Sequence, residues 1–394
     1  MLAARSAGIV LAILCAVSSS PSLAQRPLRP HPLILGSAPA ELIDRLRADP
    51  FTYFRFINRA WTERVCEAFA DLTSPTIVRL HGDAHVEQFA LTQDAWGLDD
   101  FDDSTRGPAF IDIVRFLGSL DLASRQRGWS RDRDRLWTRF FEGYRLGLSD
   151  PDSRPRDPAI VGRLRRQAPM TRAAYLEWGG QQMQPLDEAR ATAVVSGMES
   201  FEQLMRAERP ELAPGYFAVK RAGWLRTGVG SATVRKILMR VAGPTADPDD
   251  DVLLEGKEVV SLEGVRCLET PTTPPATRVI AGARQLGRLK HDILAVAPAL
   301  LRPAAADRSE TYLDWWISSW ELTYREVRLN DLRSADDLAD VAFVSGWQLG
   351  VGKLPAVRSQ ELISYAMLES RLRKETSLIV EELIAGWREL AGRG

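Results

Sequence analysis

The chain has 394 residues, 45% of them hydrophobic, and a formal net charge of −1 at pH 7. This length and apolar content predict a globular protein with a large core and two lobes or domains. The near-zero charge argues against a nucleic-acid partner, and beyond the N-terminus no segment is long and apolar enough to predict a membrane span.

The first 24 residues have the pattern of a secretory signal peptide. One early arginine precedes an apolar run from Ala7 to Val17, and Ser22-Leu23-Ala24 fits a small-x-small cleavage site. We therefore expect an exported, periplasmic or secreted protein whose mature chain begins near Gln25. Residues 25–38, rich in proline and arginine, predict an extended leader.

Removal of the signal peptide would leave two cysteines, Cys66 and Cys267. In an oxidising compartment they could form one disulfide, worth about 5 kcal/mol from the entropy of closing so long a loop. Nothing in the sequence brings the two residues together, so we expect two separate buried thiols, with the disulfide as the alternative.

Residues 39–209 predict a mostly helical lobe. The apolar spacing predicts helices over 39–48, 51–69 and 131–148, and the charged segment 159–209 is also mostly helical in its pattern. A Phe/Trp stripe on the 51–69 helix is expected to be core. Arg55 is the polar exception on that helix, and it would contact either a phosphate or an acidic side chain.

Within this lobe, two short apolar runs each end in a cluster of acids. The run 76–80 predicts a strand that ends at His81-Gly82-Asp83-Ala84-His85, and the run 96–98 predicts one that ends at Asp99–Asp103. If these strands lie side by side, both acid clusters meet at one edge. Gly107-Pro108 then turns the chain into an amphipathic helix from about Phe110, with Asp112, Arg115 and Ser119 on one face.

Carboxylates gathered at strand ends repel one another and lose hydration, and a divalent cation offsets that cost. Mg²⁺ takes one or two carboxylates together with phosphate oxygens and water, and a remaining Asp can orient or deprotonate a hydroxyl. The acid clusters therefore indicate phosphoryl-transfer chemistry. The alternative is an exposed acidic loop between strands.

The segments HGDAHVEQF, DDFDD and GPAFIDIVRFLGSL resemble the HGDxHxxN and DFD-type motifs of the aminoglycoside phosphotransferase and choline kinase group. They resemble more closely the uncharacterised bacterial family called domain of unknown function 2252 (DUF2252), which is regarded as protein-kinase-like. The resemblance implies an α+β, protein-kinase-like fold with a mostly helical large lobe and a small antiparallel β lobe. It also implies a phosphotransferase that uses Mg²⁺ and a nucleoside triphosphate on a small-molecule substrate.

The resemblance assigns roles to residues of the acid clusters. Asp83 would be the catalytic base or hydroxyl-orienting group, with His85 beside it; His81 and His85 would hold Asp83 by hydrogen bonds. Asp100 would bridge the metal, and Asp102 would be a second metal ligand. Gln88 stands where the family motif has an Asn metal ligand, with the same amide oxygen on a longer arm. Asp112 would fix this loop from the following helix.

Residues 210–275 predict the small β lobe. Strands are expected over 216–220, 233–241 and 252–260. Gly228, Gly230 and Ser231 precede an apolar strand and would close over phosphates, or else form a plain hairpin turn. Lys257 lies in a later strand, where kinases hold the nucleotide phosphates; the alternative is a solvent-facing edge lysine. These parts follow the acid clusters, so the order is permuted relative to ordinary kinases.

Residues 276–394 predict a continuation of the helical lobe, with helices over 279–297, 312–324, 335–350 and 360–390. Trp316, Trp320 and Tyr324 would share one helical face and are expected to be core. Ala281 stands where the family usually has an acid that pairs with the lysine, and Glu258 or Glu263 would have to replace it.

Two other functions stay open at this point. A kinase-like binding protein without catalysis is favoured by Gln88 and Ala281, and by the scarcity of ATP outside the cytoplasm. A metal-dependent hydrolase would use His81, Asp83, His85 and Asp100, although these spacings match no common zinc site.

Overall fold

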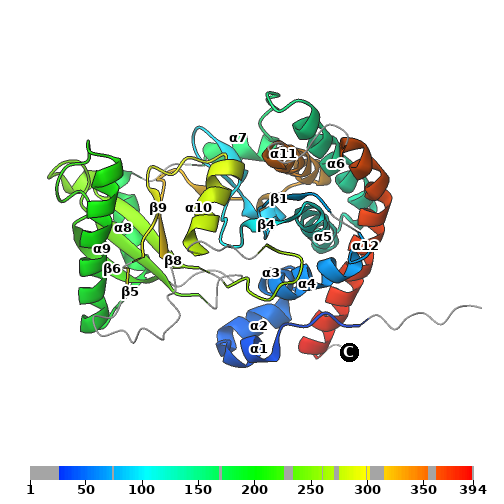
Figure 1. Cartoon of the computed structure of the whole chain (residues 1–394), viewed down its shortest axis with the longest axis horizontal. Coiled ribbons are helices and arrows are strands. Elements are labelled where there is room, and N and C mark those ends of the chain that lie inside the picture. The colour runs from blue at the N-terminus through cyan, green and yellow to red at the C-terminus, as the bar shows by residue number, and fades with distance from the viewer. Residues whose placement is uncertain are drawn as a thin grey trace, which may run out of the picture.

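The computed structural model describes residues 26–72, 75–167, 171–225, 234–259, 261–269, 275–298, 300–301, 315–353 and 361–392. The chain is a mixed α+β protein whose strand pairs are antiparallel, which confirms the expected fold class at this level. Figure 1 shows the helices α5, α6, α11 and α12 at one end and the sheet with α8 and α9 at the other. No helix in the described ranges is long and apolar enough to cross a membrane.

Four short helices begin the described chain: α1 (Pro32–Ser37), α2 (Ala40–Ala48), α3 (Pro50–Phe56) and α4 (Asn58–Ala68). The expected extended leader over 25–38 is therefore wrong for the residues that form α1. Asp49 starts α3, because its carboxylate accepts hydrogen bonds from the backbone N–H groups of Phe51 and Thr52, and Pro50 suits the first helical position.

The centre of the helical lobe is α5 (Phe110–Gln126), which is buried along nearly its whole length. Around it lie α3, α4, α6 (Arg133–Ser149), α11 (Ala335–Lys353) and α12 (Glu361–Leu390), while α7 (Ala159–Arg165) packs on α11. The helices α6 and α11 approach backbone to backbone. A Cβ atom at Gly143 of α6 would lie 1.9 Å from the carbonyl oxygen of Phe343, so glycine is required there.

The second lobe is a six-stranded antiparallel sheet in the order β5-β6-β7-β8-β10-β9. Helices α8 (Arg172–Gln182), α9 (Glu188–Glu208) and α10 (Pro275–Leu286) pack against it. The strands are β5 (Met183–Gln184), β6 (Val219–Leu225), β7 (Lys236–Val241), β8 (Val252–Glu258), β9 (Leu294–Val296) and β10 (Trp315–Ser319).

Three of these strands lie outside the predicted β lobe of residues 210–275, since β5 precedes it and β9 and β10 follow it. The helix expected over 279–297 ends at Leu286, and its last part forms β9. The helix expected over 312–324 is wrong, because the described part of that segment contains β10. Every residue of β10 is buried, so the strand lacks the polar alternation that distinguishes a strand from a buried helix.

Two small sheets carry the acid clusters. In one, β1 (Ile77–Leu80) pairs with β4 (Thr105–Pro108); in the other, β2 (Phe89–Leu91) pairs with β3 (Trp96–Leu98) and with β11 (Arg325–Glu326). The condition that the strands at 77–80 and 96–98 lie side by side is not met, because they belong to different sheets. The strand before the first acid cluster, β1, pairs instead with β4, which follows the second cluster, and β3 pairs with β2 across the hairpin turn at 92–95.

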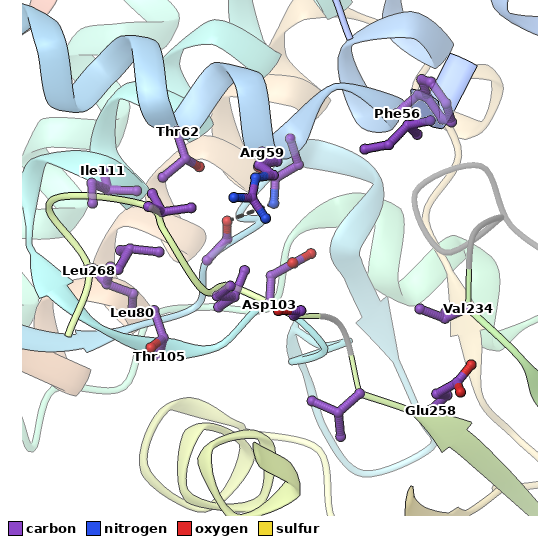
Figure 2. Close-up of a pocket in the computed structure, with 17 residues that line it drawn as sticks. Phe56, Arg59, Thr62, Leu80, Asp103, Thr105, Ile111, Val234, Glu258 and Leu268 are labelled. Atoms are coloured by element: carbon purple, nitrogen blue, oxygen red, sulfur yellow. Dashed lines mark hydrogen bonds between the residues drawn. The ribbon is translucent and has the colours of Figure 1, made fainter. Parts of the chain in front are cut away.

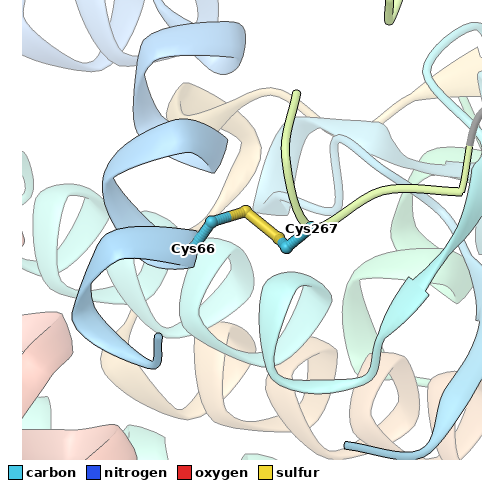
Figure 3. The surroundings of a disulfide bond; sticks show 2 residues. All are labelled: Cys66 and Cys267. Atoms are coloured by element: carbon cyan, nitrogen blue, oxygen red, sulfur yellow. A yellow bond between two sulfur atoms is a disulfide. The ribbon is translucent and has the colours of Figure 1, made fainter. Parts of the chain in front are cut away.

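A disulfide joins Cys66 of α4 to Cys267, so the expectation of two separate thiols is wrong and the alternative is correct (Figure 3). The two residues are 201 positions apart, and their Cα atoms are 5.8 Å apart. The bond ties the segment 261–269, which follows β8, to the N-terminal helices.

Candidate active site

The first acid loop (residues 81–85) and the second acid loop (residues 99–103) meet where Gly82 lies against Asp103. Gly82 has a φ of +89°, and a Cβ atom there would lie 2.0 Å from the backbone oxygen of Asp103, so only glycine permits this approach. The ring Nε2 of His81 lies 3.0 Å from the backbone oxygen of Asp99, and the Ser104 hydroxyl donates to the backbone oxygen of Leu80. The two loops thus lie in contact even though the strands before them are in different sheets.

Asp112 of α5 fixes the first acid loop, as expected from the sequence. Its two carboxylate oxygens accept hydrogen bonds of 2.9 Å from the backbone N–H groups of His81 and Gly82. The fully buried Lys353 of α11 donates to Asp112 and to the backbone oxygen of Arg79, each at 2.6 Å. The loop is therefore held by an ion pair between two helices of the core.

Asp83 is buried and engaged by Arg115 of α5. Two guanidinium nitrogens of Arg115 lie 2.7 and 2.9 Å from Asp83 Oδ1, and the guanidinium carbon lies 3.5 Å from the centre of the Phe54 ring. Burial alone would raise the pKa of Asp83, but the charge of Arg115 outweighs it and holds that pKa below its ordinary value. Asp83 is therefore ionised and a weak base in this arrangement.

His85 lies behind Asp83. Its Nε2 is 3.6 Å from the Asp83 carboxylate, longer than a hydrogen bond, and burial lowers the pKa of His85 to about 4, so the ring is neutral. His81 does contact Asp83, because its Nδ1 accepts a 3.4 Å hydrogen bond from the Asp83 backbone N–H. The expectation that both histidines hold Asp83 by hydrogen bonds is thus met by His81 alone.

Lys257 of β8 reaches the second acid loop. Its Nζ lies 3.2 Å from Asp100 Oδ1, 3.5 Å from Asp102 Oδ2 and 3.9 Å from Glu255 Oε1. Lys257 is buried in an inner strand, so the solvent-facing edge alternative is wrong. Burial lowers the pKa of Lys257, but the neighbouring carboxylates raise it well above its ordinary value and keep the ammonium charged.

Asp100 and Asp102 differ in their proton affinity. Burial and the charge of Asp100 together raise the pKa of Asp102 to about 7, whereas Lys257 holds the pKa of Asp100 low. Asp100 also has a φ of +62°, which is rare for a residue with a side chain and is typical of strained functional positions. This backbone conformation is part of the loop geometry that places the Asp100 carboxylate beside Lys257.

These residues line one cavity of about 580 Å³, a size typical of ligand pockets. Asp83, Gln88, Asp100, Asp102 and Lys257 all contribute side chains to it, whereas His85 does not. Gly228, Gly230 and Ser231 lie outside the described residues. The structure thus brings together five of the six predicted site residues that it describes.

The sequence did not reveal that a second lysine faces the same cavity. Lys236 of β7 lies directly opposite Lys257 of β8, and its Nζ is 3.8 Å from Glu255. Like charges in opposite positions of neighbouring strands are destabilising unless other charges compensate them. Glu255 lies within 4 Å of both ammonium groups and compensates them, so this wall of the cavity carries charges of both signs. The pairing register that shows this cannot be read from sequence.

The helix α10 supports the acid loop in an unexpected way. Neither Glu258 nor Glu263 replaces the missing acid at Ala281, since the Glu258 carboxylate binds Arg235 and Lys257 pairs with the acid loop instead. From α10, the buried Arg278 donates hydrogen bonds of 2.7 Å to the backbone oxygens of Asp102 and Ser104. The arginine that opens the segment RVIAGAR was the signal for this contact.

Aromatic side chains form another wall of the cavity. Trp316 of β10 lies with its ring centre 5.1 Å from Lys257 Nζ, and Trp320 donates a hydrogen bond to Glu255 at 2.7 Å. Trp178 of α8 is partly exposed beside Trp320. Trp316 also belongs to the apolar core, as expected, but through a strand rather than a helix. Arg55 both lines the cavity and pairs with Glu87 at 2.8 Å.

The donor set fits a magnesium ion, although in the described ranges no group of three or more His, Cys, Asp and Glu is arranged to hold a metal by itself. Asp100 and Asp102 offer two carboxylates, and Gln88 lines the same cavity with an amide. Mg²⁺ commonly takes one or two carboxylates and completes its shell with phosphate oxygens and water. The residues therefore suit Mg²⁺ that arrives with a nucleotide better than a metal held by protein ligands alone.

Comparison with known families gives a match in the N-terminal part of the helical lobe. Neither a curated protein nor a solved structure matches the chain. Residues 41–163, which contain both acid loops and α5, match the model of a family described as an uncharacterized protein conserved in bacteria (DUF2252), and this supports the resemblance to that family over those residues.

Proposed function

We propose that the protein is a kinase-like phosphotransferase that acts on a small molecule with a Mg²⁺-bound nucleoside triphosphate. The observation that carries this proposal is the ion pair between Lys257 and the Asp100–Asp102 loop in the cavity that Asp83 also lines. A phosphate-binding cation, metal-type carboxylates and a hydroxyl-orienting Asp are the parts that phosphoryl transfer needs, because its catalysis is mainly positioning and charge neutralisation.

The order of parts within the sheet also supports the proposal. The segment with Gly228 and Gly230 connects β6 to β7, Lys257 lies on the next strand, β8, and α10 follows. Protein kinases have a glycine-rich loop, a lysine on the third strand and then a helix in the same order. This is an analogy of architecture, and the acid loops come before it in the chain rather than after it.

Each residue would have a distinct part. Lys257 and Lys236 would hold phosphate oxygens, and Asp100, with Asp102, would ligate Mg²⁺, which when bound would neutralise charge on the transferred phosphoryl group. Asp83 would orient the acceptor hydroxyl. Its low pKa suits orientation better than early deprotonation, since a loose phosphoryl-transfer transition state needs little base catalysis.

A second candidate is a kinase-like protein that binds a nucleotide or a related anion without catalysis. The specific observation in its favour is the two-nitrogen contact of Arg115 with Asp83, which occupies one oxygen of the candidate base. We also propose that the protein works outside the cytoplasm, in keeping with the signal-like N-terminus and the disulfide. Its phosphoryl donor would then have to be available there.

Calorimetric titration of the oxidised protein tests the proposal, using ATP and GTP, each with and without Mg²⁺. We expect binding that requires Mg²⁺ and that Asp100→Asn abolishes. Asp94→Asn, on the exposed hairpin turn between β2 and β3, is the matched control and should bind like the unmodified protein. Mg²⁺-dependent binding without phosphoryl transfer to any acceptor would favour the second candidate. Absence of binding in folded protein would overturn both.

A further inference from the structure

A second cavity, of about 370 Å³, is lined by Gly82 and Asp103 at the contact between the two acid loops (Figure 2). We call it the α4 pocket, because Asn58, Arg59 and Thr62 of α4 form one wall. Strands β1 and β4, the start of α5 and the segment 261–268 form the others. Asp103 and Glu258 are the only acids among its described lining residues, and Asp103 alone also lines the first cavity.

Most of the α4 pocket is apolar. Its apolar side chains come from six parts of the chain: Ile34, Phe56, Leu80, Ile111, Val234, Val259, Leu262, Val265 and Leu268. Figure 2 shows Asp103 between the group of Leu80, Leu268 and Ile111 on one side and Val234 and Glu258 on the other. A concave apolar surface with a few convergent polar atoms is the usual form of a small-molecule site.

Two hydrogen-bond acceptors of the pocket, on Asn58 and Asp103, have no donor among the described residues. Asn58 donates from Nδ2 to the backbone oxygen of Gly82 at 3.0 Å, while its buried Oδ1 has no partner among the described residues. None of the residues that the structure describes donates a hydrogen bond to the Asp103 carboxylate. Glu258 is different, since Arg235 already neutralises it. An unpaired buried acceptor such as Asn58 Oδ1 is destabilising, and a ligand that donates a hydrogen bond to it would remove that cost.

The disulfide closes this pocket. Cys66 lies one helical turn after Thr62 on α4, and Cys267 lies between the lining residues Val265 and Leu268. Arg59 adds a 2.8 Å hydrogen bond to the backbone oxygen of Glu263 in the same segment. Two walls that are about 200 positions apart in sequence are thus fastened to each other beside the cavity.

We propose that the α4 pocket binds a small, mostly apolar molecule with a hydrogen-bond-donating head group, an amine or a hydroxyl, which lies between Asn58 and Asp103. The apolar body would fill the space between α4 and the segment 261–268. A carboxylate head group would be rejected, because it offers no donor to Asn58 and is repelled by Asp103. This pocket adjoins the proposed nucleotide site through Asp103, which lines both cavities, but the proposal does not rest on the proposed function.

The test compares three probes that share one apolar body: hexylamine, 1-hexanol and hexanoate. Binding to the oxidised full chain is measured at pH 8 by ligand-observed NMR titration. We expect hexylamine and 1-hexanol to bind at least about 10-fold more tightly than hexanoate, which corresponds to about 1.4 kcal/mol. Equal binding of all three, or no binding of any, would overturn the proposal.

Two variants keep the result specific to the pocket. Leu262→Trp fills the space and should abolish binding of all probes, while Leu204→Trp, at an exposed position of α9, is the matched control and should change nothing. Asp103→Asn should remove most of the preference for hexylamine over hexanoate. Unchanged probe binding in folded Leu262→Trp protein would contradict the assignment. Mg²⁺-nucleotide binding, measured in parallel, should survive Leu262→Trp, so the two sites are judged separately.

Discussion

Lys257 Nζ lies 3.2 Å from Asp100 Oδ1, although the two residues are 157 positions apart in the chain. The lysine comes from an inner strand of the sheet and the acid from a loop of the helical lobe, so their ion pair joins the two lobes at the floor of the cavity. Both side chains are largely removed from water, where such a pair must repay a large loss of hydration. A bound nucleotide phosphate could replace Asp100 as the partner of Lys257, and a bound divalent cation could replace Lys257 as the partner of Asp100. Neither charge would then be left unpaired.

Replacement of this lysine tests its part in ligand binding. Lys257→Met should weaken Mg²⁺-nucleotide binding about 10- to 100-fold, because a charge-assisted hydrogen bond to phosphate is worth about 1.5–3 kcal/mol. Calorimetry provides the measurement, and Lys290→Met, at an exposed position, is the control. Equal nucleotide affinity of Lys257→Met and the unmodified protein would show that the lysine is only structural.

The pH dependence of metal binding follows from Asp102. Its pKa is raised to about 7 by burial and by Asp100, so it is mostly protonated below pH 7, and Mg²⁺ must displace the proton. The affinity for Mg²⁺-nucleotide should therefore rise about fivefold between pH 6 and 7 and about tenfold between pH 6 and 8, and level off above about pH 8. Titrations in buffers of different ionisation enthalpy should reveal proton release at pH 6. Asp102→Asn should abolish that release, and a pH-independent affinity in the unmodified protein would contradict the assignment.

The contact between Asp83 and Arg115 should contribute strongly to stability. Arg115→Met leaves a buried carboxylate uncompensated and should lower the free energy of unfolding by about 3–5 kcal/mol at pH 7. The pKa of Asp83 is depressed, so the contribution is present above its unfolded pKa of 3.8 and is lost as the pH falls further. The double variant Asp83→Asn, Arg115→Met should recover most of the loss in denaturant titrations. A loss below about 1 kcal/mol in the single variant would mean that the pair is not buried in solution.

The disulfide should be a major source of stability. Replacing both Cys66 and Cys267 by serine should lower the free energy of unfolding by at most about 5 kcal/mol, because the unfolded chain regains the freedom of a long loop. Adding a reductant to the unmodified protein should have the same effect on denaturant unfolding. If the reductant leaves the unfolding midpoint unchanged while both thiols become free, this stabilisation is absent.

The sequence predicted the parts of the site better than their arrangement. The helix from Phe110 was predicted from its apolar spacing, and its polar face does hold the first acid loop: Asp112 binds its backbone, Arg115 binds Asp83, and Ser119 accepts from the Val86 N–H. Local periodicity suffices for such a helix, because the contact needs only the correct face. The resemblance also pointed to Lys257, as a phosphate-binding lysine, and this residue lies in the same cavity beside Asp100 and Asp102 of the second acid loop.

Strand pairing could not be predicted in the same way. The segment 77–80 pairs with 105–108, beyond the second acid cluster, and 96–98 pairs with 89–91 across a hairpin turn; which strands pair depends on turns and packing that sequence alone does not determine. Trp316 and Trp320 are four positions apart, which imitates a helical face, but Trp316 lies in a strand buried on both sides. Lys236 became recognisable as a site residue only when the register placed it opposite Lys257.

A crystal structure with Mn²⁺ and a non-hydrolysable ATP analogue would test the central claim most directly, because Mn²⁺ replaces Mg²⁺ and is located by its anomalous scattering. The account predicts an anomalous peak bonded to the Asp100 carboxylate, with the nucleotide phosphates against Lys257. An empty cavity at saturating analogue, with Lys257 still paired to Asp100 and Mn²⁺ bound elsewhere, would contradict it.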